Sequence, residues 1–412
     1  MKNTFLHEMQ LRGYLNQCTD ITRLNEISSK KSISAYIGFD CTASSLHVGS
    51  LVQIMILKLL QKYGHRPIVL LGGGTTLIGD PSGKDTTRKI LNSKEIKNNI
   101  KSIKKIFDKI LDRSNKNTRP IFVDNSKWLT KLNLIDFLRN VGRHFTINKM
   151  LTFDSVKLRL DREQSLSYME FNYMILQAYD FYKLFQTQKC ILQIGGSDQW
   201  GNIVNGVELI RRTIKKESFG LTSPLITLAS GAKMGKTEKG AIWLNEKLFS
   251  TYDYWQFWRN TDDRDVKKFL NFFTEIKHEE INRICEKEKN INNLKILLAN
   301  EATKVLYGGE AAKKAEKTAR ETFSGSGIGK DLPEIKVKLS EINKGINLLD
   351  LISENKIMSS KGEVRRAIAN KGLKLNNVLV IDDKKVIKNS DFEKDILKIS
   401  FGKKKHYLVK II

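Results

Sequence analysis

Two clusters in the sequence combine glycine with residue types that bind phosphate. In the first, a predicted strand ends at Asp40, a polar loop follows, and His47 opens an apolar helix. The free N–H groups and the dipole of a helix N-terminus attract anions, so a phosphate could approach backbone and imidazole together. In the second, Lys233–Thr237, two lysines flank Met-Gly and could close a loop over a polyphosphate. Taken alone, the first cluster also fits an ordinary helix cap at Ser45 with His47 on the surface.

The second cluster has the glycine, lysine and threonine of a P-loop, GxxxxGK[ST], but does not match that pattern. The position that needs the first glycine is Ser230, and the nearest glycine is Gly231. A long helix follows a P-loop, whereas Glu238–Gly240 would interrupt a helix here. The sequence therefore favours a lysine loop of another kind.

Two further clusters carry polar groups that recognise small molecules. Tyr173, Gln177 and Asp180 share one face of a predicted helix, Gln164–Phe181. The rest of this helix is mostly apolar, so the carboxylate is buried and needs a partner, either a ligand or an interior hydrogen-bond network. The fourth cluster, Gln193–Asn202, follows a predicted strand. Its small residues permit close backbone approach and its Asp and Gln suit ribose or amine groups, although a tight turn with a capped helix fits as well.

Alternating strands and helices position these clusters. Strands are predicted at Ile33–Phe39, Pro67–Leu71, Pro120–Val123 and Cys190–Ile194, and helices at Leu51–Lys62 and Asn202–Ile214. Strand, crossover helix, strand is the signature of a doubly wound parallel sheet, in which ligands bind at the carboxyl ends of the strands. We therefore predict an α/β fold with the four clusters at that edge.

The strand signals stop after about residue 250. Tyr252–Thr322 is predicted to be helical, and the run Ser324–Gly327 is typical of a flexible linker. Asn347–Ile412 is a small basic segment with 15 Lys+Arg against 8 Asp+Glu.

The composition narrows the class of protein. A net charge of +26 suggests an anionic partner, nucleic acid first, although the joint excess of Lys, Asn and Ile also fits an AT-rich genome. Isolated cysteines and scattered histidines make a protein metal site improbable. No apolar run reaches the ~18 residues of a membrane span, and the first twenty residues do not resemble a targeting segment. We expect a soluble cytoplasmic protein with no membrane contact.

Together, the order and spacing of the clusters resemble the bacterial tyrosyl-tRNA synthetase family, class I aminoacyl-tRNA synthetases. His47–Ser50 matches the HIGH-type motif, and Lys233–Thr237 matches the KMSKS-type motif. Other family-like segments are Gly79–Lys84, Gln177–Asp180, Gly195–Asn202 and, near the C-terminus, Lys361–Ile368 with Lys374–Asn377. The similarity covers nearly the whole chain.

The resemblance implies a division of the chain. Residues 1–220 would form a Rossmann-like catalytic domain, and 221–323 the lysine loop and an α-helical domain on the anticodon side of the tRNA. Residues 324–346 would be a linker, and 347–412 a small α+β RNA-binding domain of the ribosomal-protein type.

It also implies roles for individual residues. Tyrosine would be held by Tyr36 and Asp180 at its hydroxyl, by Asp80, Tyr173 and Gln177 at its ammonium, and by Gln199 at its carboxylate. ATP would be bound by Gly38, Asp40, His47, Gly49, Ser50, Gly196, Asp198 and Lys236. The reacting phosphates would be stabilised by Thr42, His47, Lys84, Lys233, Lys236 and Thr237, with Arg88 as a further candidate. RNA would contact Lys361, Arg365, Arg366 and Lys371.

The implied reaction is that of a tyrosine–tRNA ligase. ATP activates L-tyrosine to tyrosyl-adenylate with release of pyrophosphate, and tRNA(Tyr) then takes the tyrosyl group. Mg²⁺ would accompany ATP, with no tightly bound protein metal. The family is dimeric, and the surface around Trp128–Phe145 is a candidate interface.

Three departures from the family pattern concern ATP. Ser50 replaces the second histidine of the usual motif, Ile37 replaces a small or thiol side chain, and Cys41 stands where proline is frequent. Two alternatives stay open. One is a tryptophanyl-tRNA synthetase, against which Tyr36 and Asp180 favour a phenol. The other is an RNA-binding protein on a synthetase scaffold that has lost catalysis.

Overall fold

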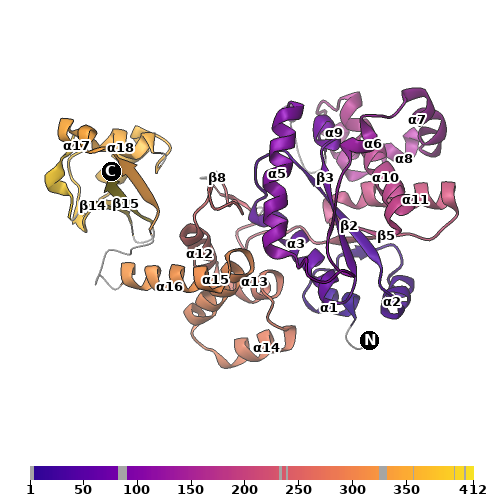
Figure 1. Cartoon of the computed structure of the whole chain (residues 1–412), viewed down its shortest axis with the longest axis horizontal. Coiled ribbons are helices and arrows are strands. Elements are labelled where there is room, and N and C mark those ends of the chain that lie inside the picture. The colour runs from indigo at the N-terminus through magenta and orange to yellow at the C-terminus, as the bar shows by residue number, and fades with distance from the viewer. Residues whose placement is uncertain are drawn as a thin grey trace. The chain divides into compact units, whose positions relative to one another are not determined.

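A computed structural model describes residues 4–81, 91–231, 234–237, 240–323, 332–355, 357–393, 395–402 and 405–412. The chain divides into two compact units, each considered by itself. The first unit contains Met1–Lys236, Ala241–Asn245 and Asp262–Lys289, and the second contains Thr237–Gly240, Glu246–Thr261 and Asn290–Ile412. Figure 1 labels the helices and strands.

The first unit is built on a six-stranded sheet. Its strands are β1 (Gln17–Cys18), β2 (Ser34–Asp40), β3 (Arg66–Gly72), β4 (Ile121–Asp124), β5 (Cys190–Gly196) and β6 (Phe219–Ser223). They lie in the order β1-β6-β5-β2-β3-β4, and every neighbouring pair is parallel except β1 with β6. Counted along the chain, the five parallel strands therefore have the order 3-2-1-4-5, and the winding direction reverses between β2 and β5.

The helices of this unit flank the sheet. They are α1 (Phe5–Leu11), α2 (Ile21–Lys30), α3 (Val48–Lys62), α4 (Thr75–Ile78), α5 (Ser93–Ile110), α6 (Ser126–Leu129), α7 (Leu134–Asn140), α8 (Ile147–Leu151), α9 (Asp154–Asp161), α10 (Tyr168–Gln188), α11 (Trp200–Ile214), α13 (Val266–Phe273) and α14 (His278–Lys287). Helices α3 and α5 lie on one side of the sheet, and α10 and α11 on the other (Figure 1). With both faces covered, Ile68–Leu71 of β3 are all buried, as a central parallel strand requires.

The predicted doubly wound parallel sheet is thus confirmed, and the element boundaries shift for local reasons. Helix α10 begins at Tyr168, four residues after the predicted start, because Ser167 and Glu170 form a capping box. It continues past Phe181 to Gln188, where Lys189 takes the left-handed conformation with φ +52°. Strand β6 was not predicted, since FGLTS is short, contains glycine and shows no apolar alternation.

The second unit begins with three helices, α12 (Thr251–Arg259), α15 (Ile291–Tyr307) and α16 (Gly309–Phe323). They pack on one another around Tyr254, Trp258 and Leu298, all of which are buried. The prediction that Tyr252–Thr322 is helical is confirmed, although α13 and α14 belong to the first unit.

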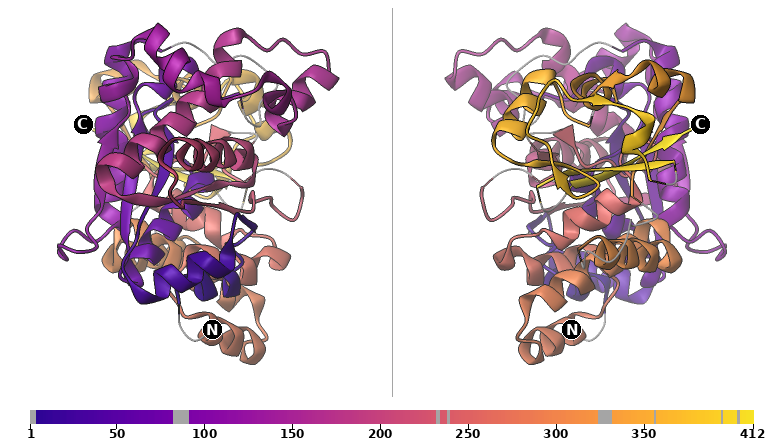
Figure 2. Two further views of the ribbon diagram at one scale, coloured as in Figure 1. Left: turned by 90° about the vertical axis from the view of Figure 1, so that its right-hand side faces the viewer. Right: turned by 90° about the vertical axis from the view of Figure 1, so that its left-hand side faces the viewer.

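The C-terminal part of this unit is an α+β fold around a five-stranded sheet. Its elements are β9 (Glu334–Val337), α17 (Leu339–Lys344), β10 (Ile346–Asn347), α18 (Leu348–Glu354), α19 (Lys361–Ala369), β11 (Leu373–Leu375), β12 (Val378–Leu379), β13 (Val386–Ile387), β14 (Ile396–Phe401) and β15 (Lys405–Ile411). The sheet order is β12-β11-β14-β15-β9. The strands of this fold appear in yellow in the right view of Figure 2.

This fold has its own apolar core, which includes Leu348, Val364 and Leu397. The range 324–346, expected to be a linker, contains β9, which pairs with β15 in parallel register. Glu334–Val337 alternates charged and apolar residues, as a strand with one buried face does, but four residues are too few to stand out in the sequence.

Candidate active site

The reversal of winding between β2 and β5 opens a cavity of about 480 Å³ at their carboxyl ends, here called the first cavity. Fourteen of the residues predicted to act on a substrate line it: Tyr36, Gly38, Asp40, Thr42, His47, Gly49, Ser50, Asp80, Tyr173, Gln177, Asp180, Gly196, Asp198 and Gln199. Four segments that are far apart in sequence thus meet at one edge of the sheet, where the topology places a ligand site.

The structure describes less of the remaining residues that were predicted to act on the phosphates. Lys84, Arg88 and Lys233 lie outside the described residues. Lys236 and Thr237 form the short strand β7 (Lys236–Thr237), paired with β8 (Gly240–Ala241), and only their backbone is described.

Asp180 of α10 is a carboxylate in a completely buried place, with 1% of its surface exposed. Asn125 Nδ2 donates to one carboxylate oxygen at 2.8 Å, and Trp128 Nε1 donates to the other at 2.7 Å. Burial raises the pKa of Asp180 to about 7, while the two hydrogen bonds act in the opposite direction. The carboxylate is therefore held in place but stays close to neutralisation at physiological pH.

Tyr36 of β2 lies beside this carboxylate. Its ring packs against Phe181, with centroids 5.4 Å apart. Its hydroxyl is buried and has no hydrogen-bond partner among the described residues. Burial raises the pKa of Tyr36 well above its ordinary value, and the charge of Asp180 adds to this shift. Because an unmade buried hydrogen bond costs about 1–3 kcal/mol, this hydroxyl suits a polar ligand group.

A chain of hydrogen bonds runs from Asp180 to Asp40 at the end of β2. Asn125 Nδ2 also lies 3.0 Å from Thr75 Oγ1, and Thr75 Oγ1 donates to Asp40 Oδ1 at 2.8 Å. Tyr173 OH donates to the second oxygen, Asp40 Oδ2, at 3.1 Å. Asp40 therefore orients Tyr173, in addition to the ATP contact that the sequence predicts for it.

The sequence did not mark Thr75 and Asn125, and it placed Trp128 only in the candidate dimer interface, whereas Trp128 donates to Asp180 in the site. One signal was available, since Asn125 directly follows β4 and so lies at the same carboxyl edge as the other polar clusters. Asn125 also accepts a 2.7 Å hydrogen bond from the N–H of Gly74, which ties the loops after β3 and β4 together. Asn125 is fully buried, and its three side-chain hydrogen bonds connect Asp180, Thr75 and Gly74.

A second group of amides lies at the end of β5. Gln199 Nε2 donates to Asp80 Oδ2 at 2.9 Å. Asn202 Nδ2 lies 3.0 Å from Gln199 Oε1 and 3.2 Å from Gln177 Oε1. Asn202 of α11 was named only as part of a motif, yet it connects the turn after β5 with α10 through these contacts.

His47 immediately precedes α3, as predicted, and its Nδ1 accepts the Gly49 N–H at 3.1 Å. Met234 and Gly235 of the lysine-loop motif lie directly against His47 and Gly49. A Cβ atom on Gly235, whose φ is +96°, would come within 2.5 Å of His47 Nδ1. A Cβ atom on Gly49 would come within 2.8 Å of the Met234 carbonyl oxygen. The two motifs therefore approach so closely that each contact requires glycine.

The four residues predicted to bind RNA lie in the C-terminal fold of the second unit. Lys361, Arg365 and Arg366 belong to α19, and Lys371 follows it with φ +54°. All four are exposed. Lys361 forms an ion pair with Asp350, and Arg365 lies 3.3 Å from Asp383, so two of these charges are partly balanced.

Comparison with known proteins identifies the class. Residues 10–324 match the family described as "tRNA synthetases class I (W and Y)". Residues 326–409 match the "Tyrosine--tRNA ligase SYY-like C-terminal domain". The chain belongs to this class I synthetase family.

Full-length relatives narrow the family to one branch. The chain is 59% identical to a tyrosine–tRNA ligase of Pelagibacter ubique over 410 residues, which cover 100% of each protein. It is 50% identical to the tyrosine–tRNA ligase of Rhodopseudomonas palustris, over 100% of this chain and 99% of that protein. The chain is thus a member of the tyrosyl-tRNA synthetases, enzymes that charge tRNA with tyrosine, and the resemblance noted in the sequence is confirmed.

A solved structure supports the fold. The C-terminally truncated mitochondrial tyrosyl-tRNA synthetase of Aspergillus nidulans aligns with a TM-score of 0.71 and 28% identity. The alignment covers 78% of this chain and 95% of that one.

The hydrogen bonds to Asp180 lead to a stability prediction. Asn125→Ala removes one donor from a buried carboxylate, removes the donor to Thr75 Oγ1 and leaves the Gly74 N–H without its acceptor. We expect the free energy of unfolding to fall by about 1–3 kcal/mol, measured by urea denaturation. The control is Asn98→Ala on an exposed position of α5, which should change stability by no more than about 0.5 kcal/mol. Equal stability of the two variants would contradict a supporting role for Asn125.

Proposed function

We propose that the first cavity activates L-tyrosine with ATP, giving tyrosyl-adenylate and pyrophosphate, and that the tyrosyl group then passes to the 3′ end of tRNA(Tyr). The observation that supports this most strongly is the buried pair of Tyr36 and Asp180 in a cavity at the switch point of the sheet. A phenol hydroxyl can donate to the carboxylate of Asp180 and accept from the unpartnered O–H of Tyr36.

This arrangement would select tyrosine over phenylalanine. Phenylalanine in the same space would leave the Tyr36 hydroxyl without a partner and Asp180 without the donor that tyrosine supplies. The phenylalanine ring offers no hydrogen bond that would offset this cost. Indole is larger and presents its N–H elsewhere, so a tryptophan would also fail to satisfy both groups. Asn125 and Trp128 support the selection indirectly by fixing the carboxylate.

The cluster of side-chain amides at the end of β5 would hold the ammonium and carboxylate of tyrosine. We assign the ammonium to Asp80, Tyr173 and Gln177, and the carboxylate to Gln199. The 2.9 Å hydrogen bond between Gln199 and Asp80 brings the two functions together, so the amino-acid head group would lie between them. Asp40 would contribute by holding the Tyr173 hydroxyl as well as by contacting ATP.

The nucleotide would lie over the other side of the cavity. We assign it to Gly38, Asp40, His47, Gly49, Ser50, Gly196 and Asp198, with Thr42 and His47 at the phosphates. Lys84, Lys233, Lys236 and Thr237 would stabilise the departing pyrophosphate. A carboxylate is already a nucleophile, so the first step needs in-line positioning and charge stabilisation rather than a protein base.

Class I synthetases use ATP as a substrate, and Mg²⁺ would enter with its phosphates. Among the described residues, no group of three or more His, Cys, Asp or Glu side chains could hold a metal ion. When bound, Mg²⁺ would neutralise charge on the pyrophosphate.

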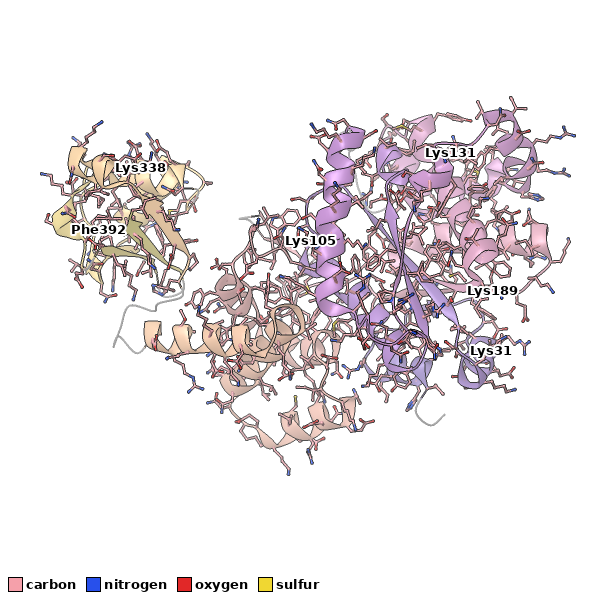
Figure 3. All side chains as sticks on the ribbon, viewed as in Figure 1. Lys31, Lys105, Lys131, Lys189, Lys338 and Phe392 are labelled. Carbon is pink, nitrogen blue, oxygen red and sulfur yellow. The ribbon has the colours of Figure 1, made fainter. Side chains whose placement is uncertain are left out.

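The C-terminal fold would bind tRNA. Lys361, Arg365, Arg366 and Lys371 would contact phosphates of the RNA backbone, since exposed basic side chains on one helix and the following turn match such a target. Figure 3 shows lysines also on separate elements of the first unit, among them Lys31, Lys105 and Lys131, so positive charge is not confined to this fold.

In the part of the chain that the structure describes, no helix is long and apolar enough to cross a membrane. We place the reaction in the cytoplasm, where translation uses charged tRNA.

Tyrosine-dependent ATP–pyrophosphate exchange tests the proposal, with phenylalanine and tryptophan as parallel substrates. We expect exchange with tyrosine only. Asp180→Asn should lower kcat/KM for tyrosine by about 10- to 100-fold, because a hydrogen bond to a charged group is lost. The control Asp108→Asn removes an exposed carboxylate from α5 and should leave kcat/KM unchanged.

Other outcomes identify the alternatives. Exchange with tryptophan would keep the fold and the mechanism but assign a different amino acid. RNA binding without pyrophosphate exchange in the presence of any amino acid would indicate a synthetase scaffold that has lost catalysis. Ser50, which replaces the second histidine of the usual motif, would then be the first residue to test. A normal KM for tyrosine in Asp180→Asn would refute the role of Asp180.

We also propose that the chain forms a homodimer through an apolar patch on α7 and α8 and at the start of α10. It comprises Leu134, Ile135, Leu138, Ile147 and Tyr168, with exposures between 43% and 78%. Such a concentration of exposed large apolar side chains marks an interface on a protein surface. The patch lies partly within the predicted stretch Trp128–Phe145 and extends beyond it.

Sedimentation equilibrium tests this proposal. We expect a mass of about twice 47.2 kDa for the native chain and about 47.2 kDa for Ile135→Lys, because a buried lysine at the interface is costly. The control Ile21→Lys alters an exposed apolar residue of α2 outside the patch and should leave the dimer intact. A monomeric native chain, or a dimeric Ile135→Lys variant, would contradict the assignment.

A further inference from the structure

A second cavity, of about 490 Å³, lies in the first unit and shares no lining residue with the first. Met55 and Leu59 of α3, Ile110 and Leu111 at the end of α5, and Tyr14 form its apolar part. The connection between α13 and α14 closes it with Thr274 and Glu275. It equals the first cavity in size, and none of the proposed steps uses it.

The polar residues around this cavity carry more positive than negative charge. Arg12, Lys58, Lys62 and Lys109 line it, against Asp112 and Glu275. Arg12 is buried and already has partners, since its guanidinium pairs with Glu8 at 2.6 Å and donates to carbonyl oxygens at the C-terminal end of α13. Lys62 and Lys109 are exposed at the mouth. The two helix C-termini add partial negative charge, which the lysines of these last turns offset.

One ion pair spans the cavity. Lys58 Nζ of α3 lies 2.9 Å from Glu275 Oε2, in the connection after α13, and Glu275 is half exposed. A ligand with an acidic group would compete with Glu275 for Lys58. The pair therefore has two possible arrangements, bridged or opened, and a bound anion would favour the second.

Helices α3 and α13 connect this cavity to the first one. Helix α3 runs from His47 in the first cavity to Lys62 in the second. Helix α13 starts beside Asp265, which accepts the Ala229 N–H at 2.7 Å at the base of the lysine loop. The other end of α13 contacts Tyr14, which lines the second cavity: Tyr14 OH donates to the Phe272 carbonyl at 2.6 Å. A shift at the far end of either helix would thus reach an ATP-binding motif.

We propose that the second cavity binds a small amphipathic anion, an aromatic or aliphatic ring system that carries a carboxylate, sulfonate or phosphate. The ring would occupy the space between Met55, Leu59 and Leu111, and the acidic group would meet Lys58 and Lys62. Occupancy opens the Lys58–Glu275 pair and changes the rate of amino-acid activation through α3 and α13. The binding stands by itself, while the effect on rate rests on the proposed function.

The binding is tested with the fluorescent aromatic sulfonate 1-anilinonaphthalene-8-sulfonate on the full chain, with the first cavity saturated by tyrosine and ATP. We expect one site per chain whose affinity falls about tenfold in Lys62→Glu, because the charge at the mouth is reversed. The control Lys97→Glu, on an exposed position of α5 that does not line the cavity, should bind as the native chain does. Equal loss in both variants, no loss in Lys62→Glu, or displacement of the probe by tyrosine and ATP would overturn the site.

The coupling is tested by pyrophosphate exchange with and without the probe. We expect the probe, at a concentration equal to its Kd for the native chain, to change kcat at least twofold in the native chain and in Lys97→Glu, and to have a clearly smaller effect in Lys62→Glu. Binding at the expected site without a change in rate would overturn the coupling and leave the site. A native chain that exchanges pyrophosphate with no amino acid would overturn the proposed function, and the fluorescence titration would still decide whether the site exists.

Discussion

The site depends on one constraint, which is that the carboxylate of Asp180 is completely buried and must be supported by donors. A buried charge without partners would be very costly, so Asn125, directly after β4, and Trp128 of α6 donate hydrogen bonds to it. Through Asn125 the same support reaches Thr75, Asp40 and Tyr173. The position of one carboxylate therefore organises the loops that follow β2, β3 and β4.

The fold supplies this constraint through its strand order. Between β2 and β5 the sheet changes its direction of winding, so the loops on either side diverge and leave space for a ligand. The polar ends of β2 and β5 face that space, while α10 brings in Tyr173, Gln177 and Asp180 from one side of the sheet. The glycines at 49 and 235 then let the HIGH-type and KMSKS-type motifs meet with no side chain between them.

Much of this arrangement could be predicted from the sequence, and the rest could not for physical reasons. The central parallel strands β2, β3 and β5 stand out because they are largely apolar, and the edge strand β4 stands out by its apolar run Ile121–Val123. The residues on α10 share a face because of the helical period. The contacts of Asn125 and Asn202 could not be predicted, because they depend on which loops the sheet order brings together. The short strands β1, β6 and β9 were missed because two to five residues carry too little pattern.

The second cavity shows a similar dependence on tertiary structure. Its lining comes from α3, α5, the segment after α1 and the end of α13, and no local pattern in the sequence marks it. Its proposed ligand would act on α3 and α13, the helices that lead to the two motifs proposed to bind ATP, so a change at one cavity would be transmitted to the other.

The most direct test of the account is the number of protons released when tyrosine binds, measured by titration calorimetry in buffers of different ionisation enthalpy. Because burial raises the pKa of Asp180 to about 7, the free enzyme carries this proton at pH 6 and has lost it at pH 8. A phenol hydroxyl that donates to the carboxylate favours the ionised form, so binding should release close to one proton at pH 6 and almost none at pH 8. The affinity for tyrosine should accordingly weaken by up to about tenfold per pH unit below 7. Asp180→Asn should show neither effect. Proton release that is absent at pH 6, or unchanged in Asp180→Asn, would contradict the claim that Asp180 binds the hydroxyl.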